Sequence, residues 1–193
     1  MITEEFVSRL KKLKKVCHHF HLSLQSGCTE TLKRMNRRYT IEEFEDIVKR
    51  LRLNYNDVVL TTDIIVGFPG ETEEEFNQTY EFLKRIKFYK MHIFKYSPRK
   101  GTKAEVMENQ ISGDDKEYRS KKLLELSDFN ENLYLDTYIG QNVDVLFEER
   151  EEEYYKGHTS NYIMVKYKTQ EELENKIKKV KIINKEELSL IAN

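Results

Sequence analysis

The chain has 193 residues, of which 33 are Lys or Arg and 34 are Asp or Glu, so its formal net charge is only −1. Two cysteines exclude a disulfide framework and cannot alone build a four-ligand metal site, while two prolines and seven glycines exclude a linker-rich chain. No apolar run approaches the roughly 20 residues that cross a bilayer, and no signal-peptide pattern follows Met1. These features predict a cytoplasmic globular protein without a membrane partner.

Helices and strands alternate over the first two thirds of the chain. Phe6, Leu10 and Leu13 recur at helical spacing and predict an amphipathic helix over residues 3–15. The segment HFHLSLQ predicts a short strand over residues 19–25, and a Ser-Gly-Cys loop follows it.

Two capping boxes mark where the next helices begin. Thr40 and Glu43 form the first, which opens a helix over residues 40–54. Thr72 and Glu75 form the second, which opens a helix that runs to residue 86.

Two more strands and a long helix complete this part. The nearly continuous apolar and β-branched run at residues 57–66 predicts a strand buried on both faces of a parallel sheet. Residues 90–95 predict a third strand, and residues 114–136 a long, highly charged helix.

After Gly140 the pattern changes to short β-rich runs separated by turns and charge clusters, VDVLFEE, NYIMVKY and KIKKVKII. These runs predict a small antiparallel β domain or barrel. We therefore expect two domains, residues 1–137 and residues 138–193.

The order of elements predicts the fold class of the first domain. Alternating strands and helices form parallel sheets with right-handed crossovers, as in a doubly wound sheet or a β/α barrel. Three parallel strands make a thin core with two open edges, so we expect this α/β domain to be part of something larger.

The loops that follow the three strands are the candidate functional loops, since β/α barrels carry their sites there. They span residues 25–28, 67–71 and 96–102, and hold both prolines and four of the seven glycines: Gly27, Gly67, Gly70 and Gly101. Such loops bind ligands in this architecture, although tight strand-to-helix turns require Gly and Pro in any case.

Basic residues are locally concentrated despite the neutral total. Residues 9–39 hold nine basic side chains against one acid, Glu30, and residues 84–103 hold eight basic side chains and no acid. This segregation fits either a polyanion-binding face or solvated helix faces.

Cys17, His18, His19 and His21 form a cluster that suggests a metal site. One strand cannot aim four such groups at one ion, so we predict no metal ligands and interpret the histidines as lining a polar pocket. Cys28 has no neighbouring base, which disfavours a reactive thiol.

Three segments, HFHLSLQSGCTETLKRMNRRYT, TDIIVGFPGETEEEF and FKYSPRKGTKA, closely resemble the radical-SAM tRNA methylthiotransferases. Within this family, the segment HLSLQSGC is most similar to the sequences of the branch that acts on N6-threonylcarbamoyladenosine beside the anticodon. The segments GQNVDVLFEE and GHTSNYIMVKY resemble the TRAM domain, a small RNA-binding β barrel. The resemblance implies the later strands of a radical-SAM (β/α) barrel, about three βα units, followed by TRAM.

The same resemblance implies cofactors, a partner and site residues. Family members use SAM and two 4Fe–4S clusters to add a methylthio group to C2 of the adenine, with the tRNA anticodon stem-loop as partner. SAM would lie beside Gln25, Ser26, Gly27, Gly67, Phe68, Pro69, Gly70 and Glu71, with Arg37 or Arg38 near its carboxylate. RNA would contact Arg99, Lys100, Lys176, Lys178, Lys179 and Lys181, and no residue is assigned to catalysis.

Three departures from the family pattern qualify this expectation. The cluster motif Cys-x-x-x-Cys-x-x-Cys is absent, His18 stands where the family has proline, and the predicted β domain is not basic. We therefore expect the isolated chain to be inactive. The alternatives are a stand-alone, non-catalytic RNA-binding module and, less favoured, a β/α-barrel lyase or aldolase without an evident lysine or carboxylate base.

Overall fold

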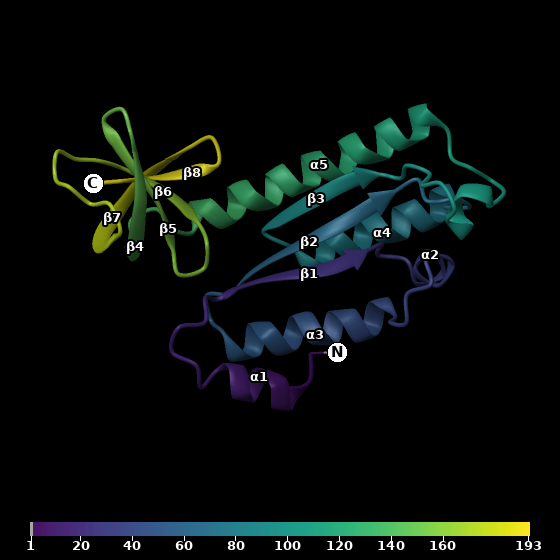
Figure 1. The fold of residues 1–193 in the computed structure, drawn as a ribbon, viewed down its shortest axis with the longest axis horizontal. Coiled ribbons are helices and arrows are strands. Elements are labelled where there is room, and N and C mark those ends of the chain that lie inside the picture. Colours follow the sequence, from purple (N-terminus) through teal and green to yellow (C-terminus); the bar gives the residue numbers. More distant parts are fainter. Residues whose placement is uncertain (1) are drawn as a thin grey trace.

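A computed structural model describes residues 2–193 as an open parallel sheet followed by a closed barrel (Figure 1). The sheet part contains α1 (Glu4–Leu10), β1 (His19–Gln25), α2 (Thr29–Arg34), α3 (Ile41–Asn54), β2 (Val59–Val66), α4 (Glu73–Ile86), β3 (Lys90–Lys95), the 3₁₀ helix η1 (Lys103–Val106) and α5 (Gly113–Asp136). The barrel contains β4 (Asn142–Glu151), β5 (Tyr154–Thr159), β6 (Met164–Lys168), β7 (Lys176–Glu186) and β8 (Ser189–Ala192).

The sheet has the order β1-β2-β3, and both pairs are parallel. Leu24, Ile64 and Met91 point to the face that the helices cover, where they join one apolar core with Phe76 and Phe82. The opposite face carries no helix layer (Figure 1). The predicted burial of β2 on both faces holds for its first half, where Val59 and Thr61 are buried, but not for its second half, where Asp63 and Ile65 are only half-buried.

Both predicted capping boxes are present. Thr40 Oγ1 accepts the Glu43 N–H and Glu43 accepts the Thr40 N–H, and Thr72 and Glu75 make the same reciprocal pair at the start of α4. Each box satisfies donors that a helix start would otherwise leave unpaired, which is why these starts could be located from sequence.

The first helix differs from its prediction. It ends at Leu10 rather than residue 15, and only Val7 is buried, while Phe6 and Leu13 are 48% and 59% exposed. The spacing of apolar residues therefore indicated the wrong face. The short elements α2 and η1 lie directly after two of the expected loops, in segments for which no helix was predicted.

The barrel closes in the order β4-β5-β6-β8-β7. Its pairs are antiparallel except β6 with β8, which are parallel. Strands β5 and β8 were not predicted, because one carries a glycine and polar residues and the other has only four residues.

The sheet and the barrel share packing at one end of β2. Val59 packs in the barrel core with Leu135 and Tyr138. The Asn161 side chain donates 2.8 Å to the Asp57 carbonyl and 2.6 Å to the Tyr138 hydroxyl. The barrel is thus attached at the end of the strands opposite the candidate loops.

Candidate functional site

The three candidate loops converge where β1, β2 and β3 end. A pocket of about 580 Å³ opens there on the uncovered face of the sheet. Its walls come from all three strands and from the segments after β2 and β3, and are formed by Gln25, Asp63, Ile65, Phe68, Phe94, Lys95, Tyr96, Ser97, Arg99, Thr102 and Ala104.

Gln25 ends β1 in a strained backbone conformation. Its φ is +73°, in the left-handed region that favours glycine, and the register of β1 against β2 shifts between Leu22 and Gln25. The side chain is 8% exposed and lines the pocket. Strain of this kind persists where the surrounding structure fixes it, and it accompanies functional sites.

Ser26 and Gly27 face α4 instead of the pocket. The Ser26 hydroxyl lies 3.2 Å from both the Thr79 hydroxyl and the Cys28 N–H. A Cβ on Gly27 would lie 2.9 Å from Thr79 Cα, closer than real contacts allow. These two predicted residues therefore seat the loop on α4, and only Gln25 reaches the pocket.

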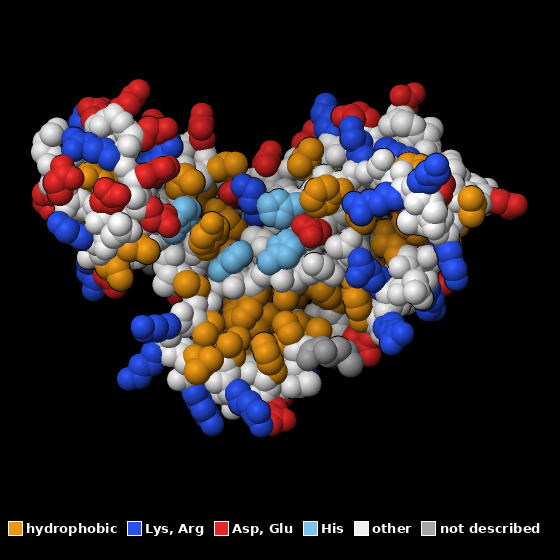
Figure 2. All heavy atoms as spheres, viewed as in Figure 1, with side chains coloured by type: hydrophobic (Ala, Val, Ile, Leu, Met, Phe, Trp, Pro, Cys, Tyr) orange, Lys and Arg blue, Asp and Glu red, His pale blue; other side chains and the backbone are white. Residues whose placement is uncertain are grey.

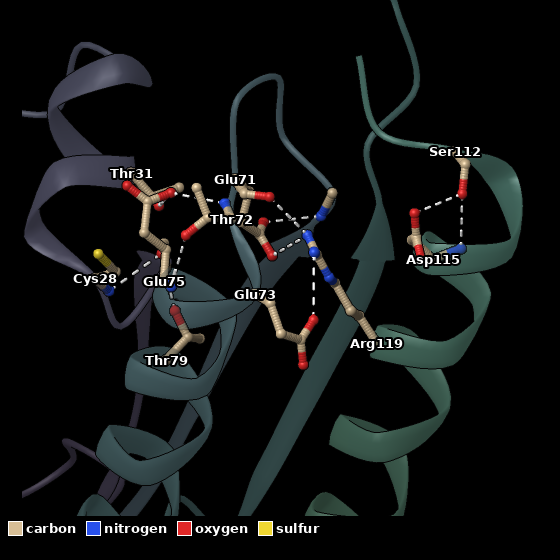
Figure 3. Close-up of polar contacts among 12 residues, drawn as sticks. Cys28, Thr31, Glu71, Thr72, Glu73, Glu75, Thr79, Ser112, Asp115 and Arg119 are labelled. Carbon is tan, nitrogen blue, oxygen red and sulfur yellow. Dashed lines mark hydrogen bonds and ion pairs between the residues drawn. The ribbon is translucent and has the colours of Figure 1, made fainter. Parts of the chain in front are cut away.

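The loop at residues 67–71 is organised around a buried carboxylate. Glu71, 5% exposed, accepts the Gly67 N–H at 2.9 Å and the Arg119 guanidinium at 3.1 Å, and its carbonyl accepts Arg119 at 3.0 Å (Figure 3). Gly67 and Gly70 have positive φ values of 70° and 77°. Phe68 alone of this loop lines the pocket, so the other predicted residues hold its shape.

Burial and ion pairing shift the pKa values of the two acids around this loop in opposite directions. Burial raises the pKa of Glu71, although Arg119 opposes the shift. Burial also acts on Glu75, but the Arg34 guanidinium, which binds both carboxylate oxygens, outweighs it and lowers the Glu75 pKa. The Glu71–Arg119 pair links this loop to α5, whereas the Glu75–Arg34 pair links α4 to α2.

Aromatic side chains form the pocket wall. The rings of Phe68 and Tyr96 meet edge to face with centroids 5.2 Å apart, and the Lys116 ammonium lies 5.4 Å from the Tyr96 ring centre. The Tyr96 hydroxyl is buried and has no hydrogen-bond partner among residues 2–193. A buried, unpaired hydroxyl is costly, and a ligand that accepts its hydrogen bond would remove that cost.

The arginines and lysines predicted to bind SAM or RNA lie in two places, at or near the ends of the sheet strands and on β7 of the barrel. Arg99 lines the pocket, whereas Lys100 is exposed beside it, and Arg37 and Arg38 are exposed beyond α2 and do not line the pocket. On β7, Lys178 pairs with Glu171 at 2.7 Å, Lys179 approaches Asp144 at 4.0 Å, and Lys176 donates to the Glu172 carbonyl. Lys181 makes no ion pair within the described part of the chain.

The residues present suit SAM better than an iron–sulfur cluster. Aromatic faces, a free tyrosine hydroxyl, an arginine and a glutamine amide match the adenine, hydroxyl and carboxylate groups of SAM. The only cysteines are Cys17, which is exposed, and Cys28, which is buried beside α4, so this chain does not provide the thiolates that a cluster requires.

Pocket residues that sequence analysis missed come from inside strands. Asp63, Ile65 and Phe94 lie on the uncovered sheet face and line the pocket, and no loop motif marked them. Side chains alternate between the two faces along β2 and β3, and this alternation would have placed the three residues together if that face had been expected to be open.

No helix among the described residues is long and apolar enough to span a membrane.

Comparison with known proteins agrees with the resemblance noted from sequence. Residues 1–83 match the Radical SAM superfamily. The threonylcarbamoyladenosine tRNA methylthiotransferase MtaB of Bacillus subtilis is 41% identical over 94% of this chain and 42% of its own length. A tRNA-2-methylthio-N(6)-dimethylallyladenosine synthase of Acetivibrio thermocellus is 37% identical over 94% of this chain and 38% of its own length.

The fold has a solved counterpart as well. Coproporphyrinogen III oxidase (HemN) from Escherichia coli, a radical SAM enzyme, superposes with a TM-score of 0.50 at 16% identity, over 69% of this chain and 30% of that one. The chain spans about two fifths of the length of the two tRNA-modifying relatives. The resemblance to radical-SAM tRNA methylthiotransferases is confirmed.

Proposed function

We propose that this chain, which spans about two fifths of the length of its tRNA-modifying relatives, is the C-terminal part of a radical-SAM tRNA methylthiotransferase and supplies the SAM pocket and the tRNA-facing β barrel of that enzyme. The observation that carries the proposal is the buried, unpaired Tyr96 hydroxyl in an aromatic pocket at the ends of three parallel strands. In the complete enzyme SAM would provide both the radical and the methyl group. Because its substrate is a tRNA, we place the enzyme in the cytoplasm.

Each pocket wall has a role in this proposal. Phe68 and Tyr96 present apolar rings to the adenine, and the Tyr96 hydroxyl donates to one of its ring nitrogens or to a ribose oxygen. We assign the SAM carboxylate to the Arg99 guanidinium, which was predicted to contact RNA, in place of the predicted Arg37 and Arg38. The Gln25 amide fixes the orientation of the carboxylate. These side chains bind and orient SAM and exclude water.

We further propose that the isolated chain has no transferase activity. Its two cysteines lie in different environments and provide no set of thiolates for a cluster that would reduce SAM. SAM binding, rather than turnover, is therefore the property by which the pocket is tested.

Calorimetric titration of the chain with SAM tests the pocket. We expect binding to weaken by about 5–10-fold in Tyr96→Phe, because one hydrogen bond of about 1 kcal/mol is lost. Arg99→Ala should weaken it by about 10-fold or more, since a charge-assisted bond is stronger. Tyr118→Phe and Lys100→Ala are matched controls outside the pocket and should leave the affinity unchanged. Absence of SAM binding, or equal affinities in all four variants, would contradict the proposal.

We propose N6-threonylcarbamoyladenosine as the modified nucleoside. One support is the 41% identity to a protein named for that nucleoside, compared with 37% to a protein named for the dimethylallyl derivative. The other is the segment HLSLQSGC, which resembles the same branch of the family. The barrel is proposed to be a TRAM domain that holds the anticodon stem-loop, with residues 138–193 as its extent.

A non-catalytic RNA-binding module is the second candidate, favoured by the closed barrel and by the lysines on β7. Lys178, Lys179 and Lys185 lie beside acids, and Lys176 donates to a backbone carbonyl. We therefore assign RNA contact chiefly to Lys181. SAM binding by the chain would favour the enzyme fragment, whereas RNA binding without SAM binding would favour the module.

Titration with a tRNA anticodon stem-loop at several salt concentrations tests the barrel. We expect affinity to fall as salt rises, and Lys181→Gln to reduce the slope of log K against log salt by about 0.7–0.9, the share of one phosphate contact. Lys178→Gln is the control, because Lys178 already pairs with Glu171. A salt-independent affinity, or equal slopes in the two variants, would contradict this assignment.

A further inference from the structure

Three metal-ligating side chains meet on the uncovered face of the sheet, one from each strand. His21 of β1, Asp63 of β2 and His92 of β3 place one ligand atom each within 4.8 Å of the others. The parallel register explains the meeting, since Asp63 is directly paired with His92 and His21 with Thr61. Figure 2 shows histidine side chains and an acidic side chain gathered in a hollow of this face.

Hydrogen bonds fix the His21 ring in an orientation that suits a metal ligand. Its Nδ1 lies 3.1 Å from the Thr61 hydroxyl, and its Nε2 lies 3.2 Å from Asp63 Oδ2. A metal-binding histidine commonly has its second ring nitrogen fixed by a hydrogen bond in this way. Thr61 also lies 3.1 Å from His19 Nε2, so one hydroxyl fixes two neighbouring rings.

His92, the third residue of this group, has ring nitrogens that are free to bind an ion. The His92 side chain makes no hydrogen bond or ion pair within residues 2–193, and its ring centre is 5.8 Å from that of His21. The nearby cation Lys90 is paired with Glu131 at 3.5 Å, and Lys95 is paired with Glu117, so the positive charges at this face are compensated. Asp63 is half-buried and gives the site its negative charge.

We propose that His21, Asp63 and His92 bind one divalent transition-metal ion of the Zn²⁺ or Fe²⁺ class. Two imidazole nitrogens and one carboxylate oxygen are the donors that these ions prefer, and three protein ligands leave positions open for water or substrate. The 3.2 Å between His21 and Asp63 is close to the roughly 3.4 Å between ligands in a tetrahedral site with bonds of about 2.1 Å. The His92 ligand atom lies within 4.8 Å of the other two, so a side-chain shift of at most about 1.4 Å brings it to the same spacing.

This site is distinct from the cysteine-ligated clusters and goes beyond the proposed function. It also differs from the metal cluster considered from sequence, whose other members have partners of their own or are exposed. His18 pairs with Asp57 at 2.5 Å, His19 stacks on Tyr162 of the barrel, and Cys17 is exposed. Of that cluster, only His21 belongs to the site.

Cobalt titration of the chelator-treated chain tests the proposal. We expect visible d–d absorption that saturates at one Co²⁺ per chain and is displaced by Zn²⁺. His92→Ala and Asp63→Asn should each weaken Co²⁺ binding by about 10-fold or more. His158→Ala is the control, because this histidine lines the same hollow but bonds to Glu148, and it should bind Co²⁺ like the parent chain.

Thermal melts of each variant establish that it is folded, which we expect for His92→Ala because His92 is exposed. Three results would overturn the proposal: no saturable Co²⁺ absorption, unchanged binding in folded His92→Ala, or an equal loss in His158→Ala. The readout does not involve SAM or RNA, so the outcome is independent of the proposed function.

Discussion

Replacing Arg119 by alanine will lower the free energy of unfolding by about 3–5 kcal/mol. Arg119 on α5 is 5% exposed, and one of its nitrogens donates to both the carboxylate and the carbonyl of Glu71. Without it, the buried Glu71 carboxylate keeps the Gly67 N–H as its partner but loses its compensating charge. The guanidinium also lies 5.4 Å from the ring centre of Phe76, so packing is lost as well.

Urea unfolding of Arg119→Ala and of Arg9→Ala measures this difference. Arg9 makes an exposed pair with Glu5, so its removal should change stability by less than about 1 kcal/mol. A loss of similar size in both variants would show that the buried pair contributes no more than a surface pair.

The pH dependence gives a second measure. Burial already raises the pKa of Glu71, and removing Arg119 will raise it further. Protonation then relieves the unpaired charge, so the deficit of Arg119→Ala should be largest above the Glu71 pKa of the folded variant. It should shrink as pH falls towards the ordinary glutamate range. A deficit that is constant with pH would contradict an electrostatic origin.

Local signals explain which parts of the fold could be predicted. Thr40 with Glu43 and Thr72 with Glu75 act over three residues, and both helices begin where these pairs indicate. The Glu71–Arg119 pair joins residues 48 apart in the chain, and nothing near either residue indicates the other. Contacts of that range depend on the completed fold.

The candidate site shows the same division. The loop motifs led to the end of the sheet where a pocket lies, and Gln25, Phe68 and Arg99 line that pocket. Which side chains face the pocket depends on which sheet face has no helix layer, a property of the whole arrangement. Asp63 was therefore interpreted as part of a buried strand, although it lies on the open face next to His21.

Gly157→Ala will destabilise the barrel by about 3 kcal/mol or more. A Cβ at Gly157 of β5 would lie 2.2 Å from the Leu146 carbonyl oxygen and 2.7 Å from Phe147 Cα, both on the backbone of β4. These atoms belong to paired strands of a closed barrel, so they cannot move away without breaking the β4–β5 ladder. At Gly67, by contrast, an added Cβ would meet only the flexible side chain of Lys116, which can rotate away. At Gly157 the clash is with backbone atoms and cannot be relieved in this way.

Gly113→Ala is the matched control, because it introduces the same methyl group at the start of α5 with no atom within 4 Å. It should be neutral or stabilising by less than about 1 kcal/mol, since alanine favours helix. Urea unfolding followed by tyrosine fluorescence measures both variants, as Tyr155 lies in the barrel core. If Gly157→Ala matched Gly113→Ala, β4 and β5 would have to be farther apart than this register allows. If only Gly157→Ala unfolds early, the close approach of these strands explains why the barrel requires glycine at this position, within a strand that its sequence alone did not reveal.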